Sequence, residues 1–88
     1  MTTTAPRTFA RLIPSATPTD EQAALVSTLL AAALTAARAA GASPARVRRE
    51  HEVVNTVLRG KRAPETTVRM VYAAFEAAGV AASVMVVD

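Results

Sequence analysis

Apolar residues recur at helical spacing in three stretches of the chain. The first, residues 20–40, has a stripe formed by Val26, Leu29, Leu30, Ala33, Ala37 and Ala40. The last, residues 65–78, repeats at i, i+3, i+4 and i+7 with Val68, Val71, Tyr72 and Phe75. Between them, residues 44–59 align Val47, Val54 and Leu58 as a third seam. These periods predict an all-α fold, a small helical domain of three to four helices.

Start and stop signals divide the helical stretches. Thr19 followed by Gln22 has the spacing of a capping box, and Gly41 is a natural left-handed stop. Ser43 and Pro44 form the next start, and Pro64 and Gly79 bracket the last helix. No glycine or proline lies near residues 50–52, so the middle stretch is either two helices, 44–51 and 52–59, or one.

The two ends of the chain differ from the helical stretches. Residues 1–18 are rich in Thr, Pro and Ala, which predicts a flexible arm ahead of a single domain over residues 19–88. Residues 84–87 are Val, Met, Val and Val, which predicts a short strand or an extended tail that needs a partner surface. We therefore expect a homodimer, with Val84 and Val86 as the dimerisation residues.

Length and composition narrow the function classes. An 88-residue chain makes one domain at most and buries only about 60% of its unfolded surface. The absence of cysteine excludes disulfides, thiolate zinc sites and cysteine nucleophiles. His51 is the single histidine, with no carboxylate cluster predicted around it, so we expect no enzyme, no metal, no cofactor and no small-molecule ligand. Because Ser27, Thr28 and Arg38 interrupt residues 20–40, we expect no membrane span and a cytoplasmic protein.

Positive charge is concentrated in the middle of the chain. Residues 38–62 carry seven cations against two carboxylates, whereas residues 63–88 carry one cation against three. Such local concentration is the electrostatic pattern expected for a polyanion partner. The alternative is a basic helix face that is merely solvated.

The stretch from Glu52 to Pro64 combines the properties of a helix that reads a DNA groove. Glu52, Asn55, Thr56 and Arg59 share one face at i, i+3, i+4 and i+7, and valines occupy the other face. Lys61 and Arg62 follow at the exit. An ordinary amphipathic helix has the same spacing.

Residues 53–66 and 71–80 together resemble the end of a lambda-repressor-like, Cro-like (XRE-type) helix-turn-helix domain. The specific part is the Arg59-Gly60-Lys61-Arg62 junction with its flanks, and the resemblance covers about residues 25–80. The connection before the reading helix is about four residues shorter than that family's. A second register competes: residues 35–47 are similar to the helix-turn-helix core of lac-repressor-type proteins, which would make Pro44–His51 the reading helix. We favour the first register, because its match continues through the following helix.

The resemblance implies a small DNA-binding transcriptional regulator of the phage or mobile-element kind, acting as a dimer on double-stranded DNA. Asn55, Thr56 and Arg59 would read bases, with asparagine suited to adenine and arginine to guanine. Phosphates would be held by Arg46, Arg48, Arg49, Lys61 and Arg62. The alternative is a helical protein-interaction module or inhibitor that self-associates and binds a protein partner without DNA.

Overall fold

The first helix, α1 (Asp20–Ala39), begins at the capping box that the sequence predicts. In the computed structural model, which describes residues 8–87, the Thr19 hydroxyl accepts the backbone N–H of Gln22 at 3.1 Å. The Gln22 side-chain oxygen accepts the backbone N–H of Thr19 at 2.9 Å, so two of the free amides at the helix start are satisfied. The Gln22 amide group also donates to the carbonyl of Gly79 at 3.3 Å, which ties this helix start to the far end of the chain.

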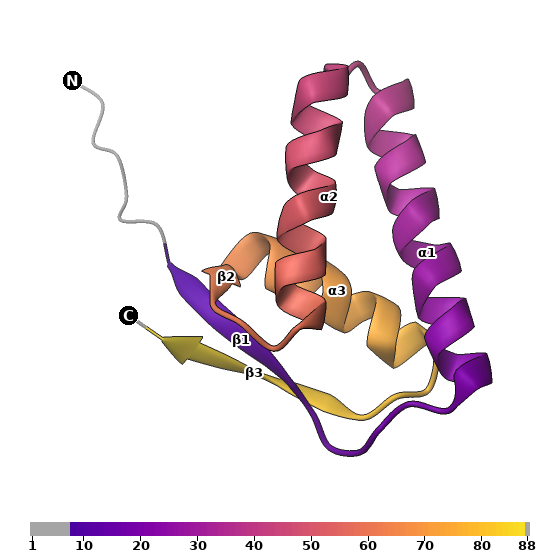
Figure 1. Cartoon of the computed structure of the whole chain (residues 1–88), viewed down its shortest axis with the longest axis vertical. Coiled ribbons are helices and arrows are strands. Elements are labelled where there is room, and N and C mark those ends of the chain that lie inside the picture. Colours follow the sequence, from indigo (N-terminus) through magenta and orange to yellow (C-terminus); the bar gives the residue numbers. More distant parts are fainter. Residues whose placement is uncertain (1–7, 88) are drawn as a thin grey trace.

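The middle stretch is one continuous helix, α2 (Pro44–Leu58). It begins at Ser43, whose hydroxyl accepts the N–H of Arg46 at 3.2 Å, and it has no break near residues 50–52. The predicted helices 44–51 and 52–59 are therefore a single helix. The candidate reading helices of the two registers lie on its first and second halves. Figure 1 shows α1 and α2 as a hairpin joined by a short turn.

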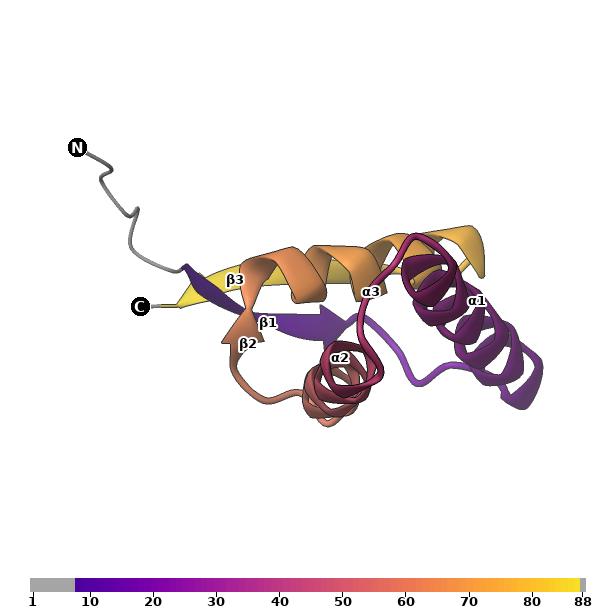
Figure 2. The same cartoon turned by 90° about the horizontal axis from the view of Figure 1, so that it is seen from above.

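The third helix, α3 (Glu65–Ala77), follows a two-residue strand, β2 (Ala63–Pro64). Its predicted apolar period is confirmed: Val68 and Val71 are fully buried and Phe75 nearly so. Glu65 and Arg69 form an ion pair at 2.6 Å on its exposed side. Figure 2 shows α3 running along the sheet, while α1 and α2 are seen nearly end-on.

The all-α prediction is wrong, because the domain contains a three-stranded antiparallel sheet. Its order is β2-β1-β3, with β1 (Phe9–Pro14) in the centre and β3 (Ala82–Val87) at one edge. Phe9 pairs with Pro64 on one side and with Val87 on the other. The fold is therefore mixed α and β, and the predicted C-terminal strand is one of three.

The strand β1 falls within the stretch that the sequence assigned to a flexible arm. Its side chains alternate between the two faces, so that Ala10 and Leu12 are buried, whereas Arg11 and Ile13 are exposed. Prolines before and after this short run obscured the alternation in the sequence. Residues 1–7 of the predicted arm, and Asp88, lie outside the described residues.

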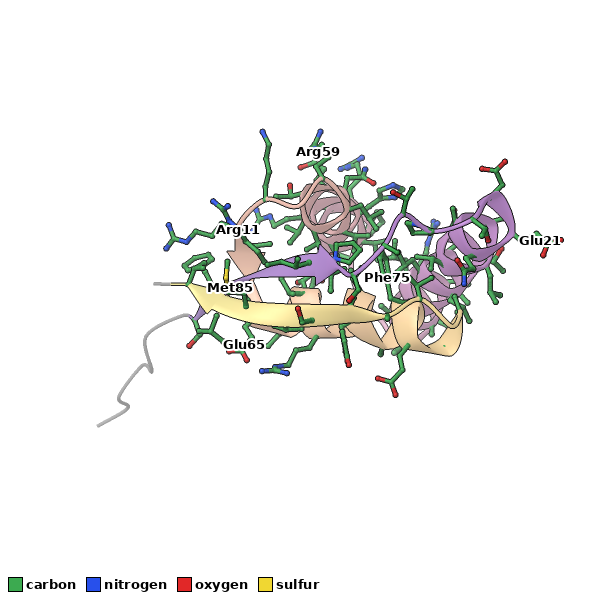
Figure 3. The ribbon with its side chains drawn as sticks, turned by 90° about the horizontal axis from the view of Figure 1, so that it is seen from below. Arg11, Glu21, Arg59, Glu65, Phe75 and Met85 are labelled. Atoms are coloured by element: carbon green, nitrogen blue, oxygen red, sulfur yellow. The ribbon has the colours of Figure 1, made fainter. Side chains whose placement is uncertain are left out.

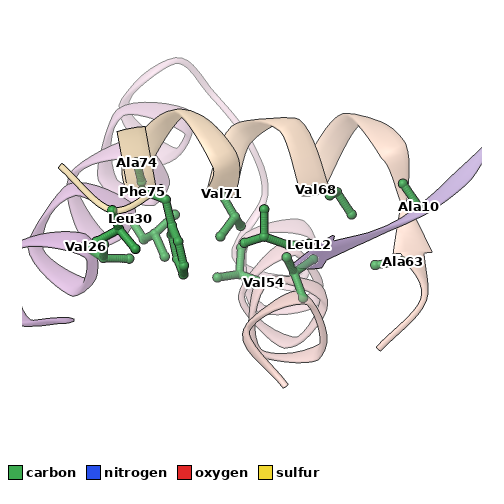
Figure 4. Close-up of a cluster of buried hydrophobic side chains, with 12 residues drawn as sticks. Ala10, Leu12, Val26, Leu30, Val54, Ala63, Val68, Val71, Ala74 and Phe75 are labelled. Carbon is green, nitrogen blue, oxygen red and sulfur yellow. The ribbon is translucent and has the colours of Figure 1, made fainter. Parts of the chain in front are cut away.

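A single apolar core joins the sheet to all three helices. Leu12 of β1, Val54 of α2 and Val71 of α3 meet at its centre, and Val26 and Leu30 of α1 pack beside Phe75 at one end (Figure 4). The core consists mostly of valine and alanine, so each residue contributes little volume and the contacts must be many.

Only the first half of α1 packs against this core. Val26 and Leu30 are its buried residues, whereas Ala37 and Ala40, which the sequence placed in a buried stripe, are exposed. The second half extends past the sheet, where α2 lies beside it (Figure 1). By length and composition alone α1 could cross a membrane, a property that core helices of soluble proteins and signal sequences share.

Replacing Leu12 by alanine tests whether β1 is part of the core. Because Leu12 is 3% exposed, Leu12→Ala should lower the free energy of unfolding by about 2 to 5 kcal/mol. Ile13 next to it is 42% exposed and lies on the other face, so Ile13→Ala should cost less than about 1 kcal/mol. Urea denaturation measures both, and equal small effects would contradict the sheet.

Candidate nucleic-acid interface

The outer face of α2 carries a row of polar side chains. Opposite the buried Val54 and Val57, the row runs through Arg48, Glu52, Asn55 and Arg59 at i, i+4, i+7 and i+11, and all four are exposed. The Thr56 hydroxyl donates to the Glu52 carbonyl at 3.1 Å, so it is partly engaged within the helix. The row therefore offers one amide and two guanidinium groups, with the carboxylate of Glu52 between them.

The other two predicted phosphate-binding residues of this helix do not join the row. At 100° per residue, Arg49 projects from the strip next to the row, whereas Arg46 lies on the side of α2 that carries Val53 and Val57. Both are exposed, but only Arg49 broadens the positive surface beside the row.

The helix ends in a turn that presents two more cations. Gly60, at φ 74°, donates its N–H to the carbonyl of Val57 at 2.9 Å, and Lys61 donates to that of Thr56 at 3.2 Å. This pair of hydrogen bonds is a Schellman motif, which satisfies carbonyls at the helix end. The turn redirects the chain, so Lys61 and Arg62 lie exposed beside the end of α2.

Strand β1 adds two residues to this site, Phe9 and Arg11. The Cζ atom of Arg62 lies 4.3 Å from the centre of the Phe9 ring, a cation–π contact that holds the turn against β1. Arg11 projects from the exposed face of the same strand. Figure 3 shows Arg11 and Arg59 on one side of the molecule, with Glu65 on the far side of β3. If the sequence had predicted a strand over residues 9–14, its alternation would have placed Phe9 and Arg11 together on one face.

The charges of this surface are not neutralised by neighbours. Among residues 8–87 the ion pair of Arg69 with Glu65 is the only one. We use the name basic face for the exposed set without an ion pair that lies along the outer row of α2 and around the turn at its end: Arg11, Arg48, Arg59, Lys61 and Arg62. Glu50, which could have offset it, is turned inward and accepts a hydrogen bond from the Thr67 hydroxyl at 2.9 Å.

A second feature, an apolar groove of about 390 Å³, lies between α1 and α2. Leu30 and Leu34 line it from α1, Leu58 from α2, and His51 and Asn55 supply polar groups. Leu58 is 45% exposed, although the sequence placed it in a core seam. Its side chain is exposed because α1 and α2 move apart toward this end of the helical hairpin (Figure 1). His51, the single histidine of the chain, is exposed and also lines this groove.

The remaining chemistry of the described chain is limited. Within residues 8–87 no three His, Cys, Asp or Glu side chains group closely enough to hold a metal ion. Val84 and Val86 lie on β3, opposite Leu12 and Ala10 of β1. Comparison of the chain with protein-family models, with curated proteins and with solved structures finds no match.

Substituting Gly60 tests the turn that presents Lys61 and Arg62. A Cβ at this position would meet no atom within 4 Å, so the cost of Gly60→Ala comes from the positive φ alone. We expect the free energy of unfolding to fall by about 1 to 2 kcal/mol. Gly60→Asn should cost less, because asparagine tolerates the left-handed region. Denaturant titration of both variants checks the order, and an alanine variant as stable as the parent would contradict it.

Proposed function

We propose that this protein is a small DNA-binding regulator that contacts double-stranded DNA through the basic face. The observation that supports the proposal is that three segments contribute exposed cations without ion pairs to one surface. These segments are the outer row of α2, the turn after it, and β1. Such a surface attracts a polyanion and releases the counterions of its phosphates. On this proposal the protein acts in the cytoplasm.

The shape of α2 suits the proposal. Its fifteen residues span about 22 Å, and a major groove about 12 Å wide admits one helix. Asn55 and Arg59 lie one turn apart on the exposed side, where they could reach base edges. Glu52 between them would repel phosphate, so the row is suited to base contact, which carboxylates can also make with cytosine. Phosphate contacts then fall to Lys61, Arg62 and Arg11 at the end of the helix, with Arg46, Arg48 and Arg49 at its beginning.

Binding to generic duplex DNA should weaken steeply as salt rises. With four to six phosphates neutralised, the slope of log K against log salt should be about −4 to −5. Fluorescence anisotropy of a labelled duplex measures it. The absence of binding at low salt would contradict the proposal.

Matched substitutions separate the basic face from net charge. Lys61→Gln combined with Arg62→Gln should weaken binding to all sequences alike and reduce the size of the slope by about 2. Arg59→Ala should reduce the preference among sequences. Arg69→Gln is the control for Lys61→Gln alone, because each removes one positive charge and Arg69 lies on α3, paired with Glu65. Circular dichroism confirms folding of each variant, and an equal loss for Arg69→Gln would place the binding elsewhere.

The apolar groove favours a second candidate, a protein-interaction module that does not bind DNA. The groove and the exposed second half of α1 offer an apolar surface of the kind that receives an amphipathic helix. Leu58→Ser would then weaken partner binding, because its side chain lines the groove, and should leave any affinity for DNA unchanged, because it does not alter the charge.

A further inference from the structure

The strand β3 has an unpaired edge. It pairs with β1 on one side over its whole length, and among the described elements it contacts only β1 and α3. Residues 82–87 contain no charge and no proline, and Met85 and Val86 are 44% and 51% exposed. Edge strands of monomeric proteins usually carry a charge, a proline or a bulge that prevents further pairing. This edge has none of these.

The hydrogen bonds show which residues face that edge. Ser15 donates its N–H to the carbonyl of Ala81 at 2.9 Å, which makes these two a hydrogen-bonded pair in the register of β1 with β3. Antiparallel pairs alternate, so Met85 and Val87 bond to β1, whereas Ala82, Val84 and Val86 turn their N–H and C=O groups outward. Pro14, which has no N–H, lies opposite Ala82, as this assignment requires.

We propose that β3 pairs with β3 of a second copy of this chain, antiparallel about a two-fold axis at Val84. In this register Val84 faces Val84 of the second copy, and Ala82 faces Val86. Each outward residue both donates and accepts, which gives about six hydrogen bonds across the axis. The result is a six-stranded sheet with β2 at both outer edges. The inference does not depend on DNA binding.

Two features favour a second copy over an unrelated strand. The outward groups of residues 82–86 are symmetric about Val84, so the strand is complementary to itself, as a two-fold interface must be. Because residues 82–87 carry no charge, self-pairing places no like charges opposite each other, although the chain has a net charge of +3.

The other edge of the sheet explains why pairing would stop at a dimer. β2 has only two residues, one of them Pro64, so it offers too few donors to recruit another strand. A closed dimer is expected and not a fibre.

The first test compares two substitutions at Val86, whose side chain is half exposed. Val86→Pro removes an outward N–H that β1 does not use and places a ring at the interface, so the monomer fold should survive. Val86→Thr keeps the N–H and a similar shape. Sedimentation equilibrium should show that the wild-type protein and the Val86→Thr variant each form a dimer. The dissociation constant of the Val86→Pro dimer should be roughly tenfold higher or more. A wild-type monomer at all concentrations, or equal constants for the two folded variants, would overturn the proposal.

Amide hydrogen exchange of the unmodified protein supplies a second readout that needs no variant. The amides of Ala82, Val84 and Val86 should become protected as protein concentration rises, whereas those of Met85 and Val87 should be protected throughout. Protection of both Ala82 and Val86 requires the two-fold axis at Val84, since neighbouring registers leave one of them unpaired. Fast exchange of all three outward amides in a concentrated sample would reject the interface, and protection of only one end of the strand would reject the register.

Discussion

The antiparallel pairing of β1 with β3 joins the two ends of the described chain, and the remaining structure depends on it. Phe9 lies opposite Val87, so the chain between these paired strands contains all three helices. The closure entropy of so long a loop must be offset by contacts on both faces of β1. Leu12 and Ala10 provide these on the inner face, where α2 and α3 bury them. On the outer face the guanidinium group of Arg62 packs over the Phe9 ring.

This arrangement connects the core to the basic face. β1 is held inward by Leu12 and outward by Phe9, so the turn after α2 is fixed against a strand that the core itself positions. Lys61 and Arg62 are thereby placed beside Arg11 by packing, even though Arg11 is distant from them in the sequence. The same packing turns Glu50 inward to Thr67 and removes a carboxylate from the surface near α2.

The limited size of the chain explains the surfaces left uncovered. A core of valine and alanine extends only as far as the sheet, so the second half of α1 has no described neighbour beyond α2. The groove beside Leu58 and the outer edge of β3 are two places where apolar or hydrogen-bonding groups of the described residues face water. Burial of either by a partner would add the contacts that a small domain lacks.

The helices were determined by local sequence, whereas the sheet was decided by the tertiary structure. Thr19 with Gln22, Ser43 with Pro44, and Gly60 act on neighbouring backbone groups, so the starts and stops of the helices could be predicted from adjacent residues. The period of Val68, Val71 and Phe75 was also sufficient to assign their burial. No comparable local signal marks β1, because its six residues form a strand only through partners at residues 63–64 and 82–87. Asn55 and Arg59 of the candidate site follow from helical spacing alone. Phe9 and Arg11 join it only because a pairing between distant segments brings β1 beneath the turn.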